Sequence, residues 1–203
     1  MLNQVVENPE RTAEYIARRD ARRAALKTDL AKLLADQTRI TLEVGAGHGH
    51  FLVEYAAAHP EEFCVGIDLL RERVERALRK RNRAKRSNLA FVQADAAEFL
   101  EALPPTLRFQ RTFVLFPDPW PKRRHHKNRI MRSEFLSTIA ARSPVGALLC
   151  FRTDDSNYFA AAKAEVQAHA DWKITENISW PFERETVFQS RAQAFQSLIA
   201  ERC

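Results

Sequence analysis

The chain has 203 residues, 45% of them hydrophobic, which is enough for one domain with a full core and hardly enough for two. Its formal net charge of +6 favours nucleic acid or another polyanion as a partner. It contains no apolar stretch long enough to span a bilayer and no signal-peptide pattern, so we expect no membrane partner and a cytoplasmic location.

Residues 1–38 carry a helical pattern, which predicts an arm and a docking helix ahead of a single domain at 39–203. Four leucines share one stripe of that helix, namely Leu26, Leu30, Leu33 and Leu34. Four arginines are expected on the opposite side, namely Arg18, Arg19, Arg22 and Arg23. The leucines favour an amphipathic helix that covers the core, whereas the arginines suit solvent and phosphate about equally.

A predicted strand at 39–44 runs into a glycine turn at Gly45, Gly47 and Gly49, and a helix begins near His50. Strand, glycine turn and helix form the opening of nucleotide-binding α/β sheets. The third glycine comes one residue too early for the dinucleotide pattern G-x-G-x-x-G. With Glu43 the pattern is E-x-G-x-G-x-G, which resembles motif I of the class I S-adenosylmethionine-dependent methyltransferases. An ordinary tight turn is the alternative interpretation.

Two further predicted strands end at carboxylates. Residues 63–67 precede Asp68, and residues 89–92 precede Asp95. An acid at the end of the second strand can accept from both ribose hydroxyls, so we favour that role for Asp68. Asp95 is expected to contact the base of a bound nucleotide. Each aspartate also suits the N-cap of the helix that follows it, and for Asp95 the two interpretations are nearly equal.

The predicted helix at 70–86 has an apolar inner face and a strongly basic outer face. Its expected inner residues are Leu70, Val74, Ala77 and Leu78. Its cationic residues are Arg71, Arg73, Arg76, Arg79, Lys80, Arg81, Arg83, Lys85 and Arg86. Such a face either follows the phosphates of a nucleic acid or is simply solvated.

The segment at 116–129 reads F-P-D-P-W-P-K-R-R-H-H-K-N-R and follows a predicted strand at 112–116. Pro117 and Pro119 lack a backbone donor, so the strand must stop there and Asp118 is held on a stiff turn. Trp120 either stacks near a base or packs under the loop. A rigid acid beside a cationic run suits an enzyme that acts on a polyanion, and a solvated loop is the alternative.

The rest of the chain continues the alternation of strands and helices. Helices are predicted at 97–103, 130–141 and 156–169, and strands at 146–151, 172–178 and 187–199. Asp154 follows the fifth strand and is expected near the substrate, because Asp155 can cap the next helix in its place. The predicted fold is α/β and Rossmann-like, with seven mostly parallel strands, an antiparallel edge strand and helices on both faces.

Cysteine and histidine usage indicates no metal site. The three cysteines, Cys64, Cys150 and Cys203, form no C-x-x-C pair, and the first two lie in apolar runs. We expect these two to be buried free thiols in a reducing compartment. The histidines near the glycine turn and the basic run have no partners at metal-ligand spacing.

Three motifs together resemble the bacterial tRNA (guanine-N7-)-methyltransferase family, which forms 7-methylguanosine in the tRNA variable loop. They are the E-x-G-x-G-x-G pattern from Glu43, F-P-D-P-W-P-K at 116–122, and the R-H-x-K run at 124–127. Thr153-Asp154 with Tyr158, and T-x-F-Q-x-R at 186–191, are similar to later motifs of the family. This sequence departs from the family by Asp68 for glutamate, Asn128 for a basic residue, Gln189 for glutamate and Ala192 for glycine.

The resemblance implies S-adenosyl-L-methionine as cofactor, tRNA as partner and a class I methyltransferase domain at 39–203. The implied cofactor contacts are Glu43, Gly45, Gly47, Asp68, Asp95 and Asp118. The implied contacts to the target nucleoside are Lys122, Asp154, Thr186 and Gln189. The implied contacts to the RNA are Arg124, His125, Lys127 and Arg129. Whether the protein is a monomer or a homodimer is left open.

Guanine N7 carries an in-plane lone pair, so its methylation requires no strong general base and depends on aligning the two reactants. The product guanine is cationic, so a nearby carboxylate stabilises the transition state more than the ground state, and Asp118 is the candidate. Asp154 suits the donor-bearing base edge, and Lys122 suits O6. Two alternatives are a methyltransferase for another RNA and a non-catalytic RNA-binding subunit. The predicted active site requires the first, second and fourth strands to end at one cleft.

Overall fold

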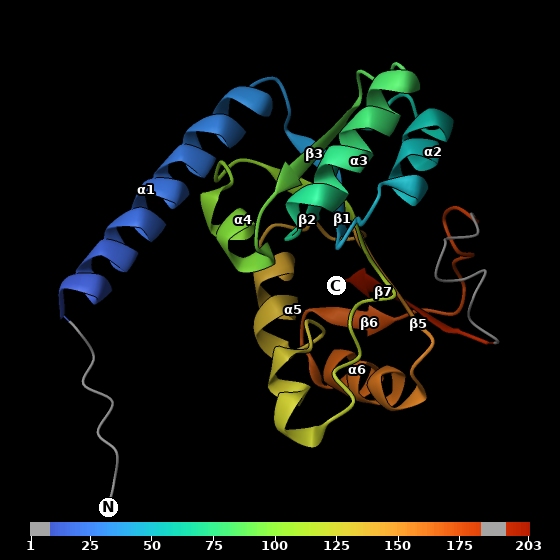
Figure 1. The fold of residues 1–203 in the computed structure, drawn as a ribbon. Helices are drawn as coiled ribbons and strands as arrows, with labels where there is room; N and C mark the ends of the chain where they lie inside the picture. The colour runs from blue at the N-terminus through green and yellow to red at the C-terminus, as the bar shows by residue number, and fades with distance from the viewer. Residues whose placement is uncertain (1–8, 184–193) are drawn as a thin grey trace, which may run out of the picture.

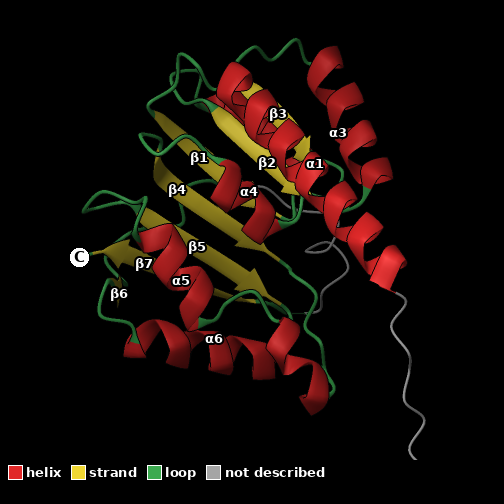
Figure 2. Ribbon diagram, turned by 90° about the vertical axis from the view of Figure 1, so that its left-hand side faces the viewer, coloured by secondary structure: helices red, strands yellow, loops and turns green. Residues whose placement is uncertain are grey.

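The computed structural model describes residues 9–183 and 194–203, which form one seven-stranded sheet with helices on both faces (Figures 1 and 2). The strands are β1 (Arg39–Val44), β2 (Cys64–Asp68), β3 (Leu89–Gln93), β4 (Arg108–Leu115), β5 (Leu148–Thr153), β6 (Trp172–Ile174) and β7 (Gln196–Arg202). The helices are α1 (Pro9–Leu33), α2 (His50–Ala58), α3 (Arg71–Arg83), α4 (Ala96–Ala102), α5 (Ser133–Ala140) and α6 (Ser156–Ala168), with a 3₁₀ helix, η1, at Arg123–Asn128.

The strand order is β3-β2-β1-β4-β5-β7-β6. Strands β1 to β5 pair in parallel, and β7 runs antiparallel to both β5 and β6. The predicted seven-stranded, mostly parallel sheet with antiparallel pairing towards one edge is therefore confirmed. The direction of strand succession reverses between β1 and β4, and such a switch point is where open α/β sheets bind ligands.

Two apolar clusters cover the two faces of the sheet. One lies under α1, α4, α5 and α6, with Phe99, Leu136 and Val166 fully buried in it. The other lies under α2 and α3 and includes Phe51, Leu52, Tyr55 and Ala56, the side chains expected to point inward from α2. Figure 2 shows α1, α4 and α5 in front of the sheet. Both faces are thus shielded from water, as a parallel sheet requires.

The N-terminal helix docks through its leucines, as expected, but two of its arginines also contact the protein. Leu30 and Leu34 are buried, while Leu33 is 40% exposed. Arg22 and Arg23 form ion pairs of 2.6 Å with Glu98 and Glu101 of α4. The prediction that all four arginines lie opposite the docked face is therefore wrong for these two.

Several predicted boundaries shift for local reasons. The helix predicted from residue 130 begins only at Ser133, because the backbone N–H groups of Ile130 and Met131 donate to the Tyr158 hydroxyl instead. Leu70, expected on an inner face, is 50% exposed and precedes α3. The sixth strand is only three residues long. Residues 187–193 of the last predicted strand lie outside the described residues.

A buried polar network around Glu62, which lies just before β2, ties β1, α2 and β4 together. The Glu62 carboxylate accepts from Thr41 Oγ1 at 2.5 Å and from the Tyr55 hydroxyl at 2.9 Å, and it forms an ion pair with Arg111. Burial alone would raise the pKa of Glu62, but these hydrogen bonds and the Arg111 charge outweigh it and lower the pKa. The network therefore holds an ionised carboxylate inside the fold.

Two of the three cysteines are inaccessible. Cys64 and Cys150 are buried and Cys203 is exposed, all as free thiols, which confirms the prediction for the first two. Burial raises the pKa of both inner thiols, that of Cys150 to about 12. Within residues 9–183 and 194–203, no helix has the length and apolar character needed to cross a membrane.

Candidate active site

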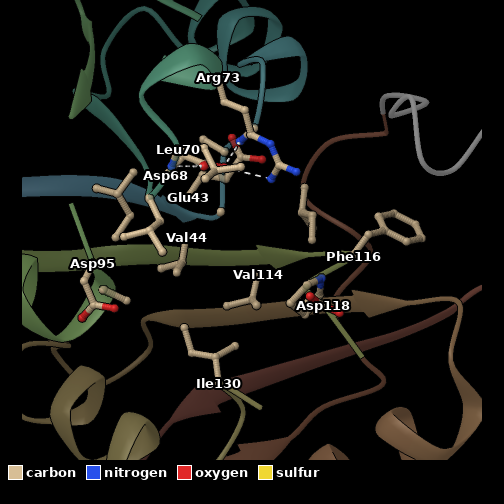
Figure 3. Close-up of a pocket in the computed structure, with 18 of the residues that line it drawn as sticks. Glu43, Val44, Asp68, Leu70, Arg73, Asp95, Val114, Phe116, Asp118 and Ile130 are labelled. Carbon is tan, nitrogen blue, oxygen red and sulfur yellow. Dashed lines mark hydrogen bonds and ion pairs between the residues drawn. The ribbon is translucent and has the colours of Figure 1, made fainter. Parts of the chain in front are cut away.

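A cavity of about 760 Å³ opens at the carboxyl ends of β1, β2 and β4 (Figure 3). Such a volume is typical of a small-molecule site. Its wall includes Glu43, Gly45, Gly47, His48, Asp68, Arg73, Asp95, Phe116, Asp118, Trp120 and Asn128. The predicted convergence of three strand ends on one cleft is confirmed, because the glycine turn and Asp118 line the same cavity.

The glycine turn is shaped by left-handed backbone. Gly45 has a φ of +78° and Gly47 a φ of +53°, which residues with a side chain rarely adopt. The backbone N–H groups of Gly45 and Ala46 both donate to the Ile67 carbonyl, which fixes the turn against β2. A Cβ on Gly45 would meet nothing within 4 Å. The turn therefore leaves space for a ligand directly against its backbone.

Glu43 is the most perturbed acid of the cavity. Its side chain is 3% exposed, and among the described residues its Oε2 atom has no hydrogen-bond partner. Desolvation, and secondly the charge of Asp68, raise its pKa to about 8. The carboxyl is thus protonated at neutral pH until a cation approaches it. A ligand with an ammonium group fits this position. It would donate a hydrogen bond to Oε2, and its positive charge would stabilise the ionised form of the Glu43 carboxyl.

Asp68 braces the glycine turn. Its carboxylate accepts from Gly47 N at 3.0 Å and Leu70 N at 2.9 Å, and lies 3.5 Å from the Arg73 guanidinium (Figure 3). The N-cap residue of α3 is Leu70, so the alternative that Asp68 caps this helix is wrong. The side chain instead joins the ends of β1 and β2 at the cavity wall.

Asp95 does cap its helix. Its Oδ1 atom accepts from the backbone N–H groups of Ala97 and Glu98 at 2.9 and 3.3 Å, at the start of α4. The residue is exposed and also lines the cavity. Both capping bonds use Oδ1, so they do not occupy Oδ2, and capping is compatible with a contact to a bound base.

The P-D-P-W-P loop carries Asp118 between two residues with strained backbone. β4 ends at Leu115, as the prolines predict. Phe116 and Trp120, each directly before a proline, have φ angles of +48° and +46°. Such conformations cost about 1–3 kcal/mol each and persist only where the surrounding structure enforces them. Asp118 is exposed and has no hydrogen-bond or ion-pair partner in the described part of the chain.

Arg129 braces this loop from behind. The side chain is 6% exposed, and its guanidinium donates to the Pro119 carbonyl at 2.9 Å and to Asn157 Oδ1 at 3.0 Å. It also lies over the Tyr158 ring, 4.8 Å from the centroid. These contacts occupy the group expected to bind RNA, so we assign Arg129 a structural role instead. It links the Asp118 loop to α6.

The rest of the basic run comprises Lys122 and η1, in which the lysine and arginine side chains are exposed and the two histidines are half-buried. Lys122, Arg124 and Lys127 are exposed, and no carboxylate of the described residues pairs with them. The Trp120 ring packs edge-on against His125 at 5.8 Å, which favours packing as its role. These cations stand beside the cavity and do not line it.

The later predicted residues are placed only in part. Asp155 accepts from Tyr158 N at 2.6 Å and caps α6, which leaves Asp154 exposed and uncommitted, as expected. Neither Asp154 nor Lys122 lines the cavity itself. Thr186 and Gln189 lie outside the described residues.

Arg152 is a residue that the sequence did not single out. It is 4% exposed, forms two hydrogen bonds to the Glu183 carboxylate at 2.6 and 3.0 Å, and donates to Ser197 Oγ at 2.8 Å. Its guanidinium lies 3.8 Å from the Trp180 ring centroid. It thereby joins β5, β7 and the segment before residue 184, all distant in sequence, and no local pattern could have revealed it.

Comparison with known proteins identifies relatives of the chain. Residues 37–197 match a family described as "Putative methyltransferase". The tRNA (guanine-N(7)-)-methyltransferase of Magnetococcus marinus is 37% identical over 64% of this chain and 52% of that protein. The enzyme of the same name from Nitrosococcus oceani is 30% identical over 81% of this chain and 70% of that protein. The chain thus spans about half the length of several curated relatives.

Solved structures share the fold. A variant of the 16S rRNA (adenine(1408)-N(1))-methyltransferase from Catenulisporales acidiphilia, solved with its cosubstrate SAM, has a TM-score of 0.58 at 21% identity. The match covers 87% of this chain and 91% of that one. The antibiotic-resistance methyltransferase Kmr gives 0.55 at 23% identity, covering 87% and 93%. At this identity the likeness demonstrates the Rossmann-like class I methyltransferase fold and no more.

Proposed function

The chain belongs to the tRNA (guanine-N(7)-)-methyltransferase family, and on that premise we propose that it transfers a methyl group from S-adenosyl-L-methionine to N7 of a guanine in the tRNA variable loop, forming 7-methylguanosine. One observation carries the proposal. A single cavity brings together the exposed carboxylate of Asp118 and the buried carboxyl of Glu43, whose Oε2 has no hydrogen-bond partner in the part of the chain that the structure describes. A tRNA substrate agrees with a cytoplasmic location and with one methyltransferase domain at 39–203 behind a docking helix.

The cofactor supplies an electrophilic methyl group on a sulfonium, and its amino-acid end carries an ammonium. Glu43 would accept from that ammonium through its unpartnered Oε2. Asp68 would accept from the ribose hydroxyls through the lone pairs that its two backbone contacts leave free. Asp95 would meet the base through Oδ2, and the backbone of Gly45 and Gly47 would approach the ligand closely.

The target guanine would enter over the exposed side of the Asp118 loop. Asp118 would stabilise the positive charge that develops on the purine, while Lys122 donates to O6 and Asp154 accepts from the base edge. In this proposal both outer residues would contact a base that has been displaced from the folded RNA. The family resemblance adds Thr186 and Gln189 to this group. Arg124, His125 and Lys127 of η1 would hold the RNA backbone.

The raised pKa of Glu43 makes cofactor binding depend on pH. Because the carboxyl has a pKa of about 8 without ligand and binds an ammonium as the anion, binding must release a proton below pH 8. We expect the dissociation constant of S-adenosylmethionine to rise about tenfold for each pH unit from 7.5 down to 6. Calorimetry across this range measures it.

The matched control is Glu43→Gln, which keeps the shape of the side chain and removes its titration. This variant should bind the cofactor weakly and almost independently of pH. A wild-type affinity that stays constant from pH 6 to 7.5 contradicts the assigned role.

The proposed activity is tested by incubating unmodified tRNA with methyl-labelled cofactor and mapping the modified base. We expect label at one variable-loop guanine and none in a tRNA that carries 7-deazaguanosine there, which lacks N7 but keeps the pairing edge. Label on another base or RNA would favour a methyltransferase of different specificity. Cofactor binding without transfer to any RNA would contradict the proposed activity.

A further inference from the structure

Four basic side chains form a continuous row on α3, which we name the α3 stripe: Arg73, Arg76, Lys80 and Arg83. Their spacing of three, four and three residues places them on one face of the helix. Lys80 fixes this face against the glycine turn, because its Nζ donates to the His48 carbonyl at 2.8 Å and lies 2.8 Å from His50 Nε2. The row is thus held in place beside the loop that lines the cavity.

The stripe carries little compensating negative charge. Among the described residues, only Arg73 of the four has a carboxylate within ion-pair distance, Asp68 at 3.5 Å. On the neighbouring side of the helix, Arg71 instead pairs with Glu75 at 2.8 Å. The arginines of α1 differ from those of the stripe, because Arg22 and Arg23 form ion pairs with the carboxylates of α4.

The concentration of positive charge affects the pKa of Lys80 within the stripe and that of His48 beside it. The pKa of Lys80 is lowered by burial first and then by Arg83 and Arg76. The pKa of His48 is lowered by burial first and then by the charges of Arg76, Lys80 and Arg73. Repulsion of this kind destabilises the free protein slightly and is relieved when an anion binds.

The stripe also begins at the active site. Arg73 lines both the active-site cavity and an adjoining hollow of about 340 Å³. The hollow is lined by His48, Arg71 and Arg76 as well, with Glu72 as its one carboxylate. The cations of η1 directly follow the loop after β4, which lines the cavity through Pro117, Asp118 and Trp120. Positive charge is therefore available on two separate elements around the opening.

We propose that the α3 stripe binds the phosphate backbone of the RNA substrate next to the nucleotide presented to the cavity. This rests on the proposed function and adds a second RNA-binding element to η1. Each phosphate neutralised by a lysine or arginine releases counterions, and the dependence of log affinity on log salt steepens by about 0.7–0.9 per contact.

The test is the variant Arg76→Gln/Arg83→Gln, because both side chains are exposed and their loss should not disturb the fold. Its control is Lys32→Gln/Arg39→Gln, which removes two exposed charges near the amino end of β1, away from the cavity. At physiological salt we expect the tRNA dissociation constant of the stripe variant to rise about tenfold and its salt slope to fall by about 1.5. The control should match the wild type, and both should bind S-adenosylmethionine normally.

Transfer by the wild-type protein is measured in parallel, so the two hypotheses can fail separately. If the wild type methylates tRNA while the stripe variant keeps its affinity and salt slope, the stripe proposal is wrong and the activity stands. A wild type that binds tRNA but methylates no guanine contradicts the activity. In that case a reduced slope for the stripe variant alone would still support the RNA surface.

Discussion

Replacing Asp118 by asparagine is expected to lower the rate of methyl transfer to tRNA by about two to three orders of magnitude. The substitution keeps the size of the side chain but removes the negative charge that would stabilise the developing guaninium. The fold should not change, because Asp118 is exposed and, in the ranges that the structure describes, forms no ion pair or hydrogen bond. Changes at such positions usually stay within about 0.5 kcal/mol of stability.

Single-turnover transfer at saturating tRNA and cofactor isolates this effect from binding. Asp29→Asn is the matched control, since Asp29 is an exposed aspartate on α1 and should keep the wild-type rate and melting temperature. Asp118→Glu restores the charge at a displaced position and should recover part of the rate. A transfer rate for Asp118→Asn within a few fold of the wild type would refute the role.

Replacing Glu62 by alanine is expected to destabilise the fold by about 3–5 kcal/mol. The substitution leaves Arg111 without its counter-ion and the hydroxyls of Thr41 and Tyr55 without their acceptor. Breaking a buried pair from one side costs far more than removing an exposed one, and here the Arg111 charge that remains is only 29% exposed and so stays partly desolvated. Since the network joins β1, α2 and β4, the loss should affect the whole sheet.

Urea unfolding measures this difference, with Arg71→Gln as the control at the exposed pair with Glu75, where we expect about 0.5 kcal/mol or less. The pH dependence adds a second readout. The folded pKa of Glu62 lies below its ordinary value, so its contribution is present above that value and is lost as pH falls through the folded pKa. The alanine variant should therefore lose less stability on acidification. A cost below about 1 kcal/mol would contradict the network's importance.

Much of the fold could be predicted because its signals are local. The run R-I-T-L-E-V gives β1 with its observed bounds, and the glycine turn follows where left-handed backbone is required. The prolines of P-D-P-W-P end β4 within one residue of the prediction. In each case the information lies in a few consecutive residues, where steric limits on the backbone decide the outcome.

What the sequence did not reveal depends on partners far along the chain. Arg22 and Arg23 find carboxylates 76 and 78 residues away, beyond the reach of any helical periodicity. In the sequence Arg129 is one more member of a basic run, yet in the structure its guanidinium is buried and donates to Asn157 and to the Pro119 carbonyl. A run of charge does not indicate which of its members turns inward, because that depends on what the fold places behind it.

The antiparallel direction of β7 also determines where a covalent label can be coupled to a cysteine of this protein. Gln196 pairs with Thr153 and Glu201 with Leu148. The chain therefore runs back to the amino ends of the parallel strands, opposite the cleft, before it reaches Cys203. That cysteine is the one accessible thiol, since Cys64 and Cys150 are shielded inside. A maleimide fluorophore or a solid support coupled there would leave the cavity, where we propose that RNA binds, unobstructed. One labelled preparation would therefore serve both fluorescence and surface-capture experiments.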